Sequence, residues 1–210
     1  MIIETKPTLL FPLWNYDETG HDTGIPVSPL GFITNQNRMA IPTWSYAMET
    51  YRPARIVEIG AYNGGFTCAL AIHAYNIGAR VYSFDRSEIP NAKYKALGDF
   101  LGIHWFVMDC FSEQGISTIM DLVKLPGVTY LLCDGGNKVL EITTFAPFLK
   151  PGDVIAGHDY YVARPDYWPR TELPIEQVEA ALSSNSFVPF MQEYFDAAAW
   201  LVFRKLTVSA

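Results

Sequence analysis

The sequence predicts an α/β protein with a seven-stranded, mostly parallel sheet, helices on both faces and an antiparallel pair of strands at its C-terminal end. From residue 54 onward, five short apolar runs alternate with stretches of helical spacing. Strands separated by helices pair in parallel through right-handed crossovers, which place helices on both faces of the sheet. The last two apolar runs are separated by only three residues, and so short a connection requires antiparallel pairing.

The individual elements follow from residue type and spacing. The strand-like runs are rich in β-branched and aromatic residues, and several helical stretches stop at a glycine or begin with a proline. Strands are expected at Arg55–Ile59, Arg80–Phe84, Ile103–Met108, Val128–Cys133, Asp153–Ala156, Ser186–Tyr194 and Ala198–Lys205. Helices are expected at Arg38–Tyr51, Phe66–Ile77, Pro90–Leu101, Ile116–Lys124, Lys138–Leu149 and Ile175–Leu182.

Two segments fall outside this alternation. Residues 1–37 contain many prolines and glycines among scattered aromatics, which is typical of an irregular arm. Tyr160–Pro174 is rich in aromatic residues and proline. We therefore expect residues 1–53 to form an arm and helix packed on the core, and residues 54–210 to form the main domain. The two irregular segments could cover the ends of the strands and supply aromatic walls for a small substrate.

Composition restricts the class of protein. The net charge is −7 with only 15 basic residues and no basic run, which disfavours nucleic acid and anionic membranes as partners. The sequence shows neither a signal peptide nor an apolar stretch of the roughly 18 residues that a membrane span needs, so we expect a cytoplasmic protein. Three dispersed cysteines in apolar surroundings, Cys68, Cys110 and Cys133, are expected to be buried free thiols.

The stretch Arg55–Thr67, RIVEIGAYNGGFT, predicts a strand, a tight turn and the start of a helix. This arrangement brings backbone N–H groups up to a ligand. The spacing of its glycines differs from the dinucleotide pattern G-x-G-x-x-G, because Tyr62 stands where the second glycine of that pattern would be.

Acidic residues recur where the expected strands end. Ligands of an open parallel sheet lie beyond the carboxyl ends of its strands, so acids at these ends meet in one crevice. We expect these side chains to be exposed to that crevice and therefore to avoid the cost of burying a charge. The residues are Glu58, Asp85, Asp109, Asp134 and the pair His158-Asp159.

Together, these features resemble the class I S-adenosylmethionine-dependent methyltransferases, over roughly residues 54–205, with a Rossmann-like sheet. The resemblance implies that Glu58 lies behind the glycine-rich turn, that this turn admits the methionine end of the cofactor, that Asp85 binds the ribose hydroxyls and that Asp109 and Cys110 hold the adenine. The full set of implied cofactor-binding residues is Glu58, Gly60, Ala61, Tyr62, Asn63, Gly64, Gly65, Asp85, Arg86, Asp109, Cys110 and Asp134.

Two segments of the second half, LLCDGGNKVLE (Leu131–Glu141) and PGDVIAGHDY (Pro151–Tyr160), resemble a small-molecule group near the cation-dependent O-methyltransferases. The resemblance implies that Asp134, His158 and Asp159 hold Mg²⁺ or another divalent cation. The chain departs from the group in two places: Asn137 stands where histidine is common, and no second acid adjoins Asp159. A site without metal is therefore the alternative.

Without a metal, His158 is the expected catalytic base, because its side chain titrates near neutral pH. The alternative is a histidine with a structural hydrogen bond. Lys138 is a second possible base by analogy with relatives that have a lysine near this strand, and its alternative is a solvated lysine at a helix start. Asp134 completes the expected catalytic set, as the acid that binds the cation.

We therefore expect S-adenosylmethionine-dependent methyl transfer to a small-molecule acceptor, at a hydroxyl oxygen, by a protein that could form a homo-oligomer. The segment Asp134–Asn137, DGGN, lacks the N/D-P-P-Y/F/W pattern of nucleic-acid amino-methyltransferases, which argues against a base as acceptor. Two other classes stay open: a non-catalytic module that binds S-adenosylmethionine or a nucleotide, and an NAD-dependent oxidoreductase, which the missing second glycine weakens.

Overall fold

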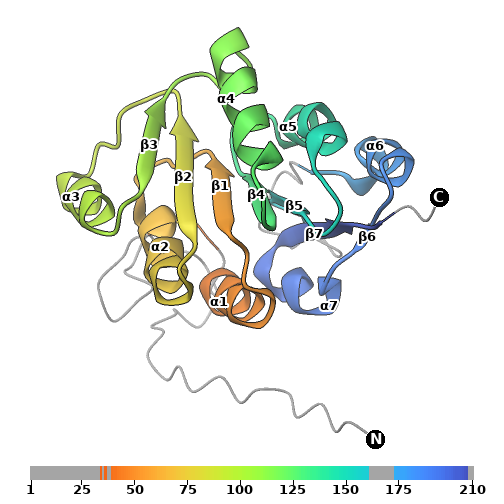
Figure 1. The fold of residues 1–210 in the computed structure, drawn as a ribbon, viewed down its shortest axis with the longest axis horizontal. Helices are drawn as coiled ribbons and strands as arrows, with labels where there is room; N and C mark the ends of the chain where they lie inside the picture. The colour runs from red at the N-terminus through yellow and green to blue at the C-terminus, as the bar shows by residue number, and fades with distance from the viewer. Residues whose placement is uncertain (1–33, 35, 37–38, 161–172, 208–210) are drawn as a thin grey trace, which may run out of the picture.

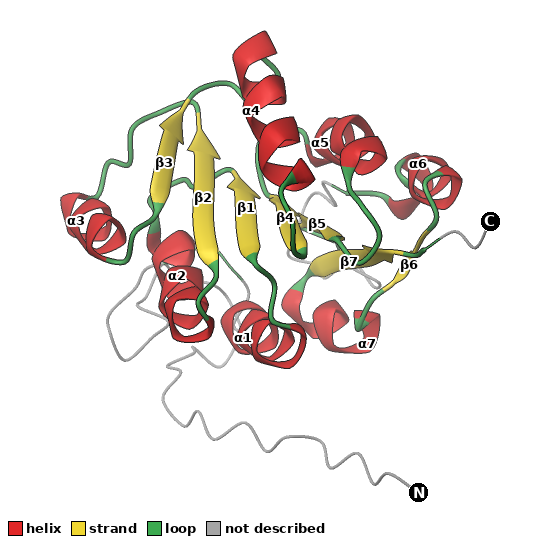
Figure 2. Ribbon diagram, viewed as in Figure 1, coloured by secondary structure: helices red, strands yellow, loops and turns green. Residues whose placement is uncertain are grey.

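A computed structural model describes residues 34, 36, 39–160 and 173–207, and shows one seven-stranded sheet in the order β3-β2-β1-β4-β5-β7-β6 (Figures 1 and 2). The strands are β1 (Arg55–Ile59), β2 (Arg80–Asp85), β3 (His104–Val107), β4 (Thr129–Cys133), β5 (Val154–His158), β6 (Phe187–Pro189) and β7 (Trp200–Lys205). Strands β1 to β5 pair in parallel, whereas β7 runs antiparallel to both β5 and β6. The predicted fold class is confirmed.

Helices cover both faces of the sheet (Figure 2). They are α1 (Ala40–Tyr51), α2 (Gly65–Ile77), α3 (Ala92–Phe100), α4 (Glu113–Lys124), α5 (Lys138–Phe145), α6 (Glu179–Ser184) and α7 (Gln192–Phe195). One apolar cluster joins α1, α2, α3 and α7 to one face of the sheet, and a second cluster joins α4, α5 and α6 to the other face. The residues of the central strands β1, β4 and β5 are buried on both sides, as is usual in a parallel sheet, whereas the edge strand β3 is half-buried or exposed.

Helix α1 belongs to the first of these clusters through Trp44. Its ring is only 1% exposed and lies 4.6 Å from Phe195, 5.4 Å from Trp200 and 5.9 Å from Tyr130, measured between ring centroids. The helix therefore packs on the main sheet. The division at residue 53 stays a prediction, since most of the arm lies outside the described residues.

Two helices begin at positions set by a capping side chain. Helix α3 was expected from Pro90 but begins at Ala92, because the Asn91 side chain accepts hydrogen bonds from the next backbone N–H groups. Helix α4 was expected from Ile116 but begins at Glu113, because the Ser112 hydroxyl accepts from a backbone N–H. With Ser112 as its cap, α4 begins three residues earlier than apolar spacing predicted.

Other helix boundaries differ where the backbone tightens. The helix expected over Lys138–Leu149 ends at Phe145 and continues as a 3₁₀ turn, Ala146–Phe148, around Pro147. The helix expected from Ile175 begins as a 3₁₀ turn, Ile175–Gln177, before α6.

Strand β5 is longer than expected, since it continues through Gly157 and His158. A glycine usually weakens a strand. Here the glycine makes room for the buried Leu173 side chain, which would have to shift because a Cβ at Gly157 would lie 2.3 Å from its Cδ2 atom. His158 is the last residue of this central strand and pairs with Trp200 of β7.

The expected strand Ser186–Tyr194 is wrong in its second half. Only Phe187–Pro189 pairs with β7, and Met191 adopts a left-handed backbone before the short helix α7. The Gln192 side chain takes the place of a strand here: it donates to the Trp200 carbonyl at 2.8 Å and accepts from the Val202 N–H at 2.9 Å. The antiparallel pairing is confirmed, but its connection is longer than three residues.

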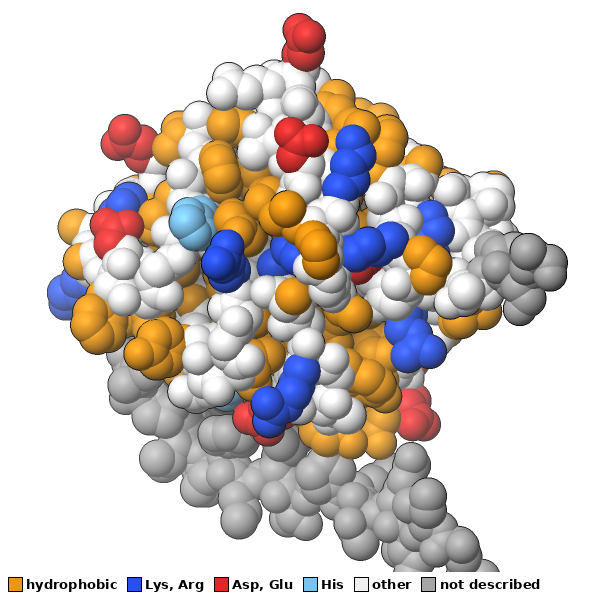
Figure 3. All heavy atoms as spheres, viewed as in Figure 1, with side chains coloured by type: hydrophobic (Ala, Val, Ile, Leu, Met, Phe, Trp, Pro, Cys, Tyr) orange, Lys and Arg blue, Asp and Glu red, His pale blue; other side chains and the backbone are white. Residues whose placement is uncertain are grey.

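The described surface is mixed in character, and the three thiols lie beneath it. On the face shown in Figure 3, Lys and Arg side chains are interspersed with acidic, apolar and neutral ones. Among the residues that the structure describes, no helix is long and apolar enough to cross a membrane. Cys68, Cys110 and Cys133 are buried and free, as predicted.

Candidate active site

The site lies where the order of the sheet reverses. Strand β1 is flanked by β2 on one side and by β4 on the other, so the loops that follow β1 and β4 diverge and leave a crevice between them. Gly60, directly after β1, has φ +93°, and a Cβ there would lie 2.3 Å from the Asp134 carbonyl oxygen. Only glycine allows the two loops to lie so close at their first residues, before they diverge.

Glu58 does not face the crevice, which corrects the expectation that every strand-end acid is exposed to it. Its side chain is 1% exposed and accepts hydrogen bonds from the Thr67 hydroxyl at 2.6 Å and the Ser83 hydroxyl at 2.5 Å. Burial raises the pKa of Glu58 from 4.5 to about 7, although these two hydroxyls act against the rise. Glu58 thus lies behind the turn, where it joins β1 to β2 and to the start of α2.

Asp85 fixes the glycine-rich turn against the end of β2. One of its carboxylate oxygens accepts from the Tyr62 N–H at 2.9 Å, and the other accepts from the Ser87 N–H at 3.0 Å. Asn63 acts within the same turn, since its side-chain oxygen accepts from the Gly65 N–H at 2.9 Å. The turn is thereby held by the Asp85 side chain from β2 and by its own Asn63 side chain.

Asp109 lies beside the crevice and faces Arg86. Their charged atoms are 3.1 Å apart, and the Asp109 carboxylate also accepts from the Phe111 N–H at 2.9 Å. The backbone hydrogen bond from Phe111 and the Arg86 guanidinium lower the pKa of Asp109. Of these two neighbouring residues, Cys110 and not Asp109 lines a cavity at this edge of the sheet.

A cavity of about 460 Å³ opens at this edge, between the ends of β1, β2 and β3 and the loop after β4. Four of the predicted cofactor residues line it: Gly60, Asp85, Arg86 and Cys110. Four other lining residues, Gly135, Gly136, Asn137 and Glu141, lie in the segment Leu131–Glu141 that carries the family resemblance, although no role in cofactor binding was predicted for them. The remaining lining residues were not singled out in the sequence: Ile59, Phe84, Ser87, Met108 and Phe111.

Glu141 holds the loop that forms one side of this cavity. It is 1% exposed, and its two carboxylate oxygens accept from the Gly135 and Asn137 N–H groups, each at 3.2 Å. Burial raises the pKa of Glu141 to about 7, against the effect of these two hydrogen bonds. Asn137 in turn caps α5 by accepting from the Leu140 N–H at 3.0 Å, which gives a structural role to a residue that departs from the family pattern.

A second cavity of about 270 Å³ adjoins the first, and Gly60 lines both. Polar side chains from β4, β5 and the N-terminal segment face it together with aromatic ones. Its lining residues are Gln36, Gly60, Ala61, Tyr62, Asn63, Phe66, Asp134, His158 and Asp159.

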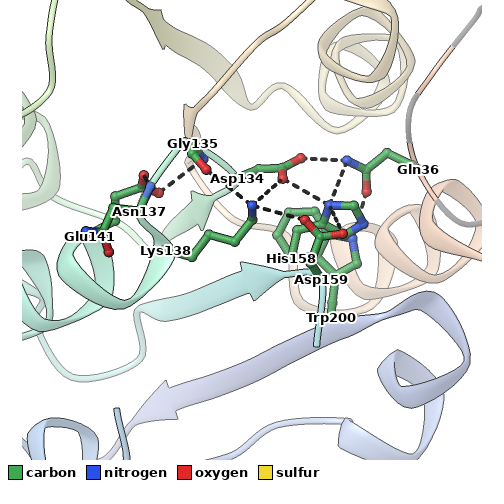
Figure 4. Close-up of polar contacts among 9 residues, drawn as sticks. All are labelled: Gln36, Asp134, Gly135, Asn137, Lys138, Glu141, His158, Asp159 and Trp200. Carbon is green, nitrogen blue, oxygen red and sulfur yellow. Dashed lines mark hydrogen bonds and ion pairs between the residues drawn. The ribbon is translucent and has the colours of Figure 1, made fainter. Parts of the chain in front are cut away.

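Beside this second cavity lies a group of four charged residues, Asp134, Lys138, His158 and Asp159, which we term the charged cluster (Figure 4). The His158 Nδ1 atom lies 3.0 Å from Asp134 Oδ1 and 3.5 Å from Asp159 Oδ1. The Lys138 ammonium lies 3.0 Å from Asp159 Oδ2, 3.9 Å from Asp134 Oδ1 and 3.2 Å from the Gly135 carbonyl oxygen. The structure thus brings together all of the predicted catalytic and metal-binding residues.

Burial strengthens the interactions within the charged cluster. Lys138 and His158 are each 5% exposed, so the alternative of a solvated lysine is wrong. Burial acts to lower the pKa of His158, but the nearby carboxylates of Asp134 and Asp159 outweigh it, and the pKa is raised above 6.5. Asp159 adopts a left-handed backbone, with φ 61°, where the chain leaves β5.

Gln36, from the N-terminal segment, connects the charged cluster to the core. Its amide nitrogen donates to Asp134 Oδ2 at 2.6 Å, and its oxygen accepts from the Trp200 indole N–H at 3.0 Å (Figure 4). The Trp200 ring also lies 5.0 Å from the His158 ring. The sequence predicted that the arm could reach the strand ends, but no pattern in it singled out Gln36.

The three residues expected to bind a metal lie close together. Ligand atoms of Asp134, His158 and Asp159 lie within 4.8 Å of one another. However, all four carboxylate oxygens of the two acids already lie within 4.0 Å of a side-chain nitrogen of Gln36, Lys138 or His158. A divalent ion bound between the two acids would have to displace the Lys138 ammonium, because two cations at such short range repel each other. The arrangement does not fit a divalent cation, and metal binding stays a prediction.

Comparison with known proteins agrees with this fold. No protein-family model and no curated protein matches the chain. The strand order of this sheet and its antiparallel C-terminal strands are those of the class I S-adenosylmethionine-dependent methyltransferase fold. Among solved structures, the chain is similar to the apo form of CmcI-N160, with 19% identity, a TM-score of 0.65 and coverage of 92% of this chain and 79% of that one.

Two further solved structures are similar over most of the chain. A structure of cmcI-D160 with Mg-SAM shows 20% identity and a TM-score of 0.61, covering 92% of this chain and 82% of that one. The SAH-bound methyltransferase PaMTH1 from Podospora anserina shows 15% identity and a TM-score of 0.57, covering 81% and 79%. At such identities the similarity establishes the fold.

Proposed function

We propose that this protein transfers a methyl group from S-adenosylmethionine to a hydroxyl oxygen of a small molecule. The observation that carries the proposal is the pair of adjoining cavities that share Gly60. The larger cavity lies beside the strand-end acid Asp85, and the smaller lies beside the charged cluster. A cofactor and an acceptor bound in adjoining spaces would have their reacting ends near one another, which is the main requirement for direct group transfer.

The larger cavity suits the cofactor in size and polarity. Its volume of about 460 Å³ falls in the range of small-molecule sites. In this proposal Asp85 accepts hydrogen bonds from the ribose hydroxyls, and Met108, Cys110 and Phe111 form the apolar wall beside the adenine. In this proposal the methionine end extends past Gly60 to the turn that follows it, whose residues Ala61, Tyr62 and Asn63 line the smaller cavity, so the two ligands meet there. When bound, S-adenosylmethionine supplies an electrophilic methyl group.

The smaller cavity suits an acceptor with a hydroxyl group. Its walls combine the aromatic rings of Tyr62 and Phe66 with the polar groups of Asp134, His158 and Asp159. Aromatic walls with a few convergent polar groups favour a small, partly planar or sugar-like molecule. The volume of about 270 Å³ favours an acceptor of modest size.

In this proposal His158 acts as the catalytic base. Both of its hydrogen bonds to described residues involve Nδ1, which faces Asp134 Oδ1 at 3.0 Å. This contact orients the ring and stabilises the protonated imidazole that forms when His158 takes the proton of an acceptor hydroxyl. Lys138, in contrast, faces Asp159 and the Gly135 carbonyl, so we assign it a role as charge partner rather than base.

Calorimetry with S-adenosylmethionine and with NAD tests the cofactor. We expect S-adenosylmethionine to bind more tightly, and Asp85→Asn to weaken its binding by about tenfold, since a charge-assisted hydrogen bond is lost. The matched control is Asp99→Asn, which changes an acid on α3 that pairs with Lys95 and does not line the cavity. Tighter binding of NAD would refute the proposal and favour an oxidoreductase.

Methyl transfer to a panel of catechols, sugars and other hydroxylated molecules separates a catalyst from a binding module. We expect His158→Gln to lower the rate by about 100-fold or more, because the base is lost, while the affinity for S-adenosylmethionine changes by less than about threefold. Equal rates in the variant and the wild type would exclude His158 as the base.

A further inference from the structure

Lys138 occupies an unusual position for a lysine. It is the first residue of α5, where the positive end of the helix dipole disfavours a cation. Its side chain is also 5% exposed, and lysines are almost never so fully buried without a partner. The helix dipole and burial both disfavour the charged form of Lys138. In this structure the two carboxylates that Lys138 faces compensate for both effects.

The ammonium group of Lys138 lies between two acids that come from different strands. Asp134 follows β4 and Asp159 follows β5, and the ammonium is 3.9 Å and 3.0 Å from their nearest oxygens. The side chain is directed there because α5 starts directly after the capped loop at Asn137, so its first residue lies beside the Asp134 carboxylate. The arrangement resembles the one in which a metal ion joins two carboxylates.

Charge balance within the cluster agrees with this comparison. When His158 is protonated, two positive and two negative groups face one another, and the cluster is neutral. When His158 is neutral, only one negative charge is left over. Divalent cations are held by several oxygen ligands whose charge they balance. A cluster with at most one uncompensated negative charge offers little of that balance.

We propose that the ammonium group of Lys138 is the resident cation of the charged cluster and replaces a divalent metal ion between Asp134 and Asp159. Lys138 is then a positioning residue: it holds the two carboxylates in place, and through Asp134 the His158 ring. This inference rests on the proposed function for its consequence, which is that methyl transfer proceeds without a metal.

Calorimetric titration with Mn²⁺ alone tests the inference without an acceptor. We expect the wild-type protein to show no binding, and Lys138→Met to bind Mn²⁺ at least about tenfold more tightly, because removal of the ammonium leaves the carboxylates of Asp134 and Asp159 without the cation between them. Adding Asp159→Asn to this variant should abolish the gain. Lys95→Met, which removes the lysine of an exposed pair with Asp99 on α3, should show none.

Two outcomes of this titration would decide against the inference. Binding of Mn²⁺ by the wild type would mean that the metal and not Lys138 is the resident cation. A lack of binding by both the wild type and the variant would mean that these residues form no cation site. If Lys138→Met does not fold, Lys138→Gln, which can still donate a hydrogen bond to Asp159, replaces it. Failure to bind S-adenosylmethionine would refute the proposed function but leave the Mn²⁺ result to stand by itself.

Discussion

Glu58→Gln tests the buried carboxyl behind the glycine-rich turn. The folded protein raises the pKa of Glu58 from 4.5 to about 7 through burial, so between these pH values the folded state holds a proton that the unfolded state has lost. The free energy of unfolding therefore falls as the pH rises through this window. Glutamine is neutral at every pH and has an oxygen that can accept from both Thr67 and Ser83.

The size of the effect follows from the displaced pKa. A rise from 4.5 to about 7 corresponds to roughly 3 kcal/mol, at about 1.4 kcal/mol for each pKa unit. Relative to wild type, Glu58→Gln should gain about 2 to 3 kcal/mol in the free energy of unfolding between roughly pH 5 and pH 8. Contributions from other titrating groups cancel, since the two proteins share them.

Urea unfolding of both proteins at the two pH values measures this difference. Glu88→Gln, which changes an exposed residue, is the control and should keep a constant difference from wild type across the range. A constant difference for Glu58→Gln as well would show that Glu58 is ionised in the folded protein near neutral pH, and would refute the reasoning.

Three further predictions concern single contacts. Gly60→Ala should destabilise the protein by about 2 kcal/mol or more and weaken binding of S-adenosylmethionine, because its Cβ would meet the Asp134 carbonyl and its φ of +93° is strained; unchanged thermal unfolding and calorimetry would contradict this. Gln36→Ala leaves the buried Trp200 N–H without its acceptor and should cost about 1 to 3 kcal/mol in urea unfolding, whereas a smaller loss would mean that water replaces the amide. Trp44→Ala should cost about 3 to 5 kcal/mol in the same assay, because the ring is fully buried; a loss under 1 kcal/mol would show that α1 is not part of the core.

The fold could be predicted from the sequence because its signals are local. Each parallel strand is a short apolar run, and each crossover helix has its own spacing, so the alternation was visible without knowledge of any contact. The strand-end positions of Asp85, Asp134 and Asp159 followed from the topology alone. The second half of Ser186–Tyr194 could not be predicted, because the Gln192 amide replaces a strand there, and apolar spacing does not reveal such a side-chain bond.

The site was predicted only as far as its residues lie at strand ends. The burial of Glu58 depends on hydroxyls of Thr67 and Ser83, which lie 9 and 25 positions further along the chain. The contact of Gln36 with Trp200 spans 164 positions, and nothing local in the sequence marks it. The sequence left Lys138 open between a base and a solvated lysine, because its position at a helix start does not reveal whether its side chain is buried. The contacts of Glu58 with Ser83, Gln36 with Trp200 and Lys138 with Asp159 join different segments of the chain, which local spacing does not reveal.

The position of β7 in the sheet sets an order on folding. Strand β6 precedes β7 in the chain, but in the sheet β7 lies between β5 and β6. During synthesis β6 therefore has no edge to join until β7 has emerged from the ribosome and paired with β5. The same strand carries Trp200, whose indole holds Gln36 against Asp134. The strands that border the larger cavity, β1 to β4, can thus assemble on the nascent chain, whereas the contact that holds Gln36 beside the smaller cavity forms only after β7 is made.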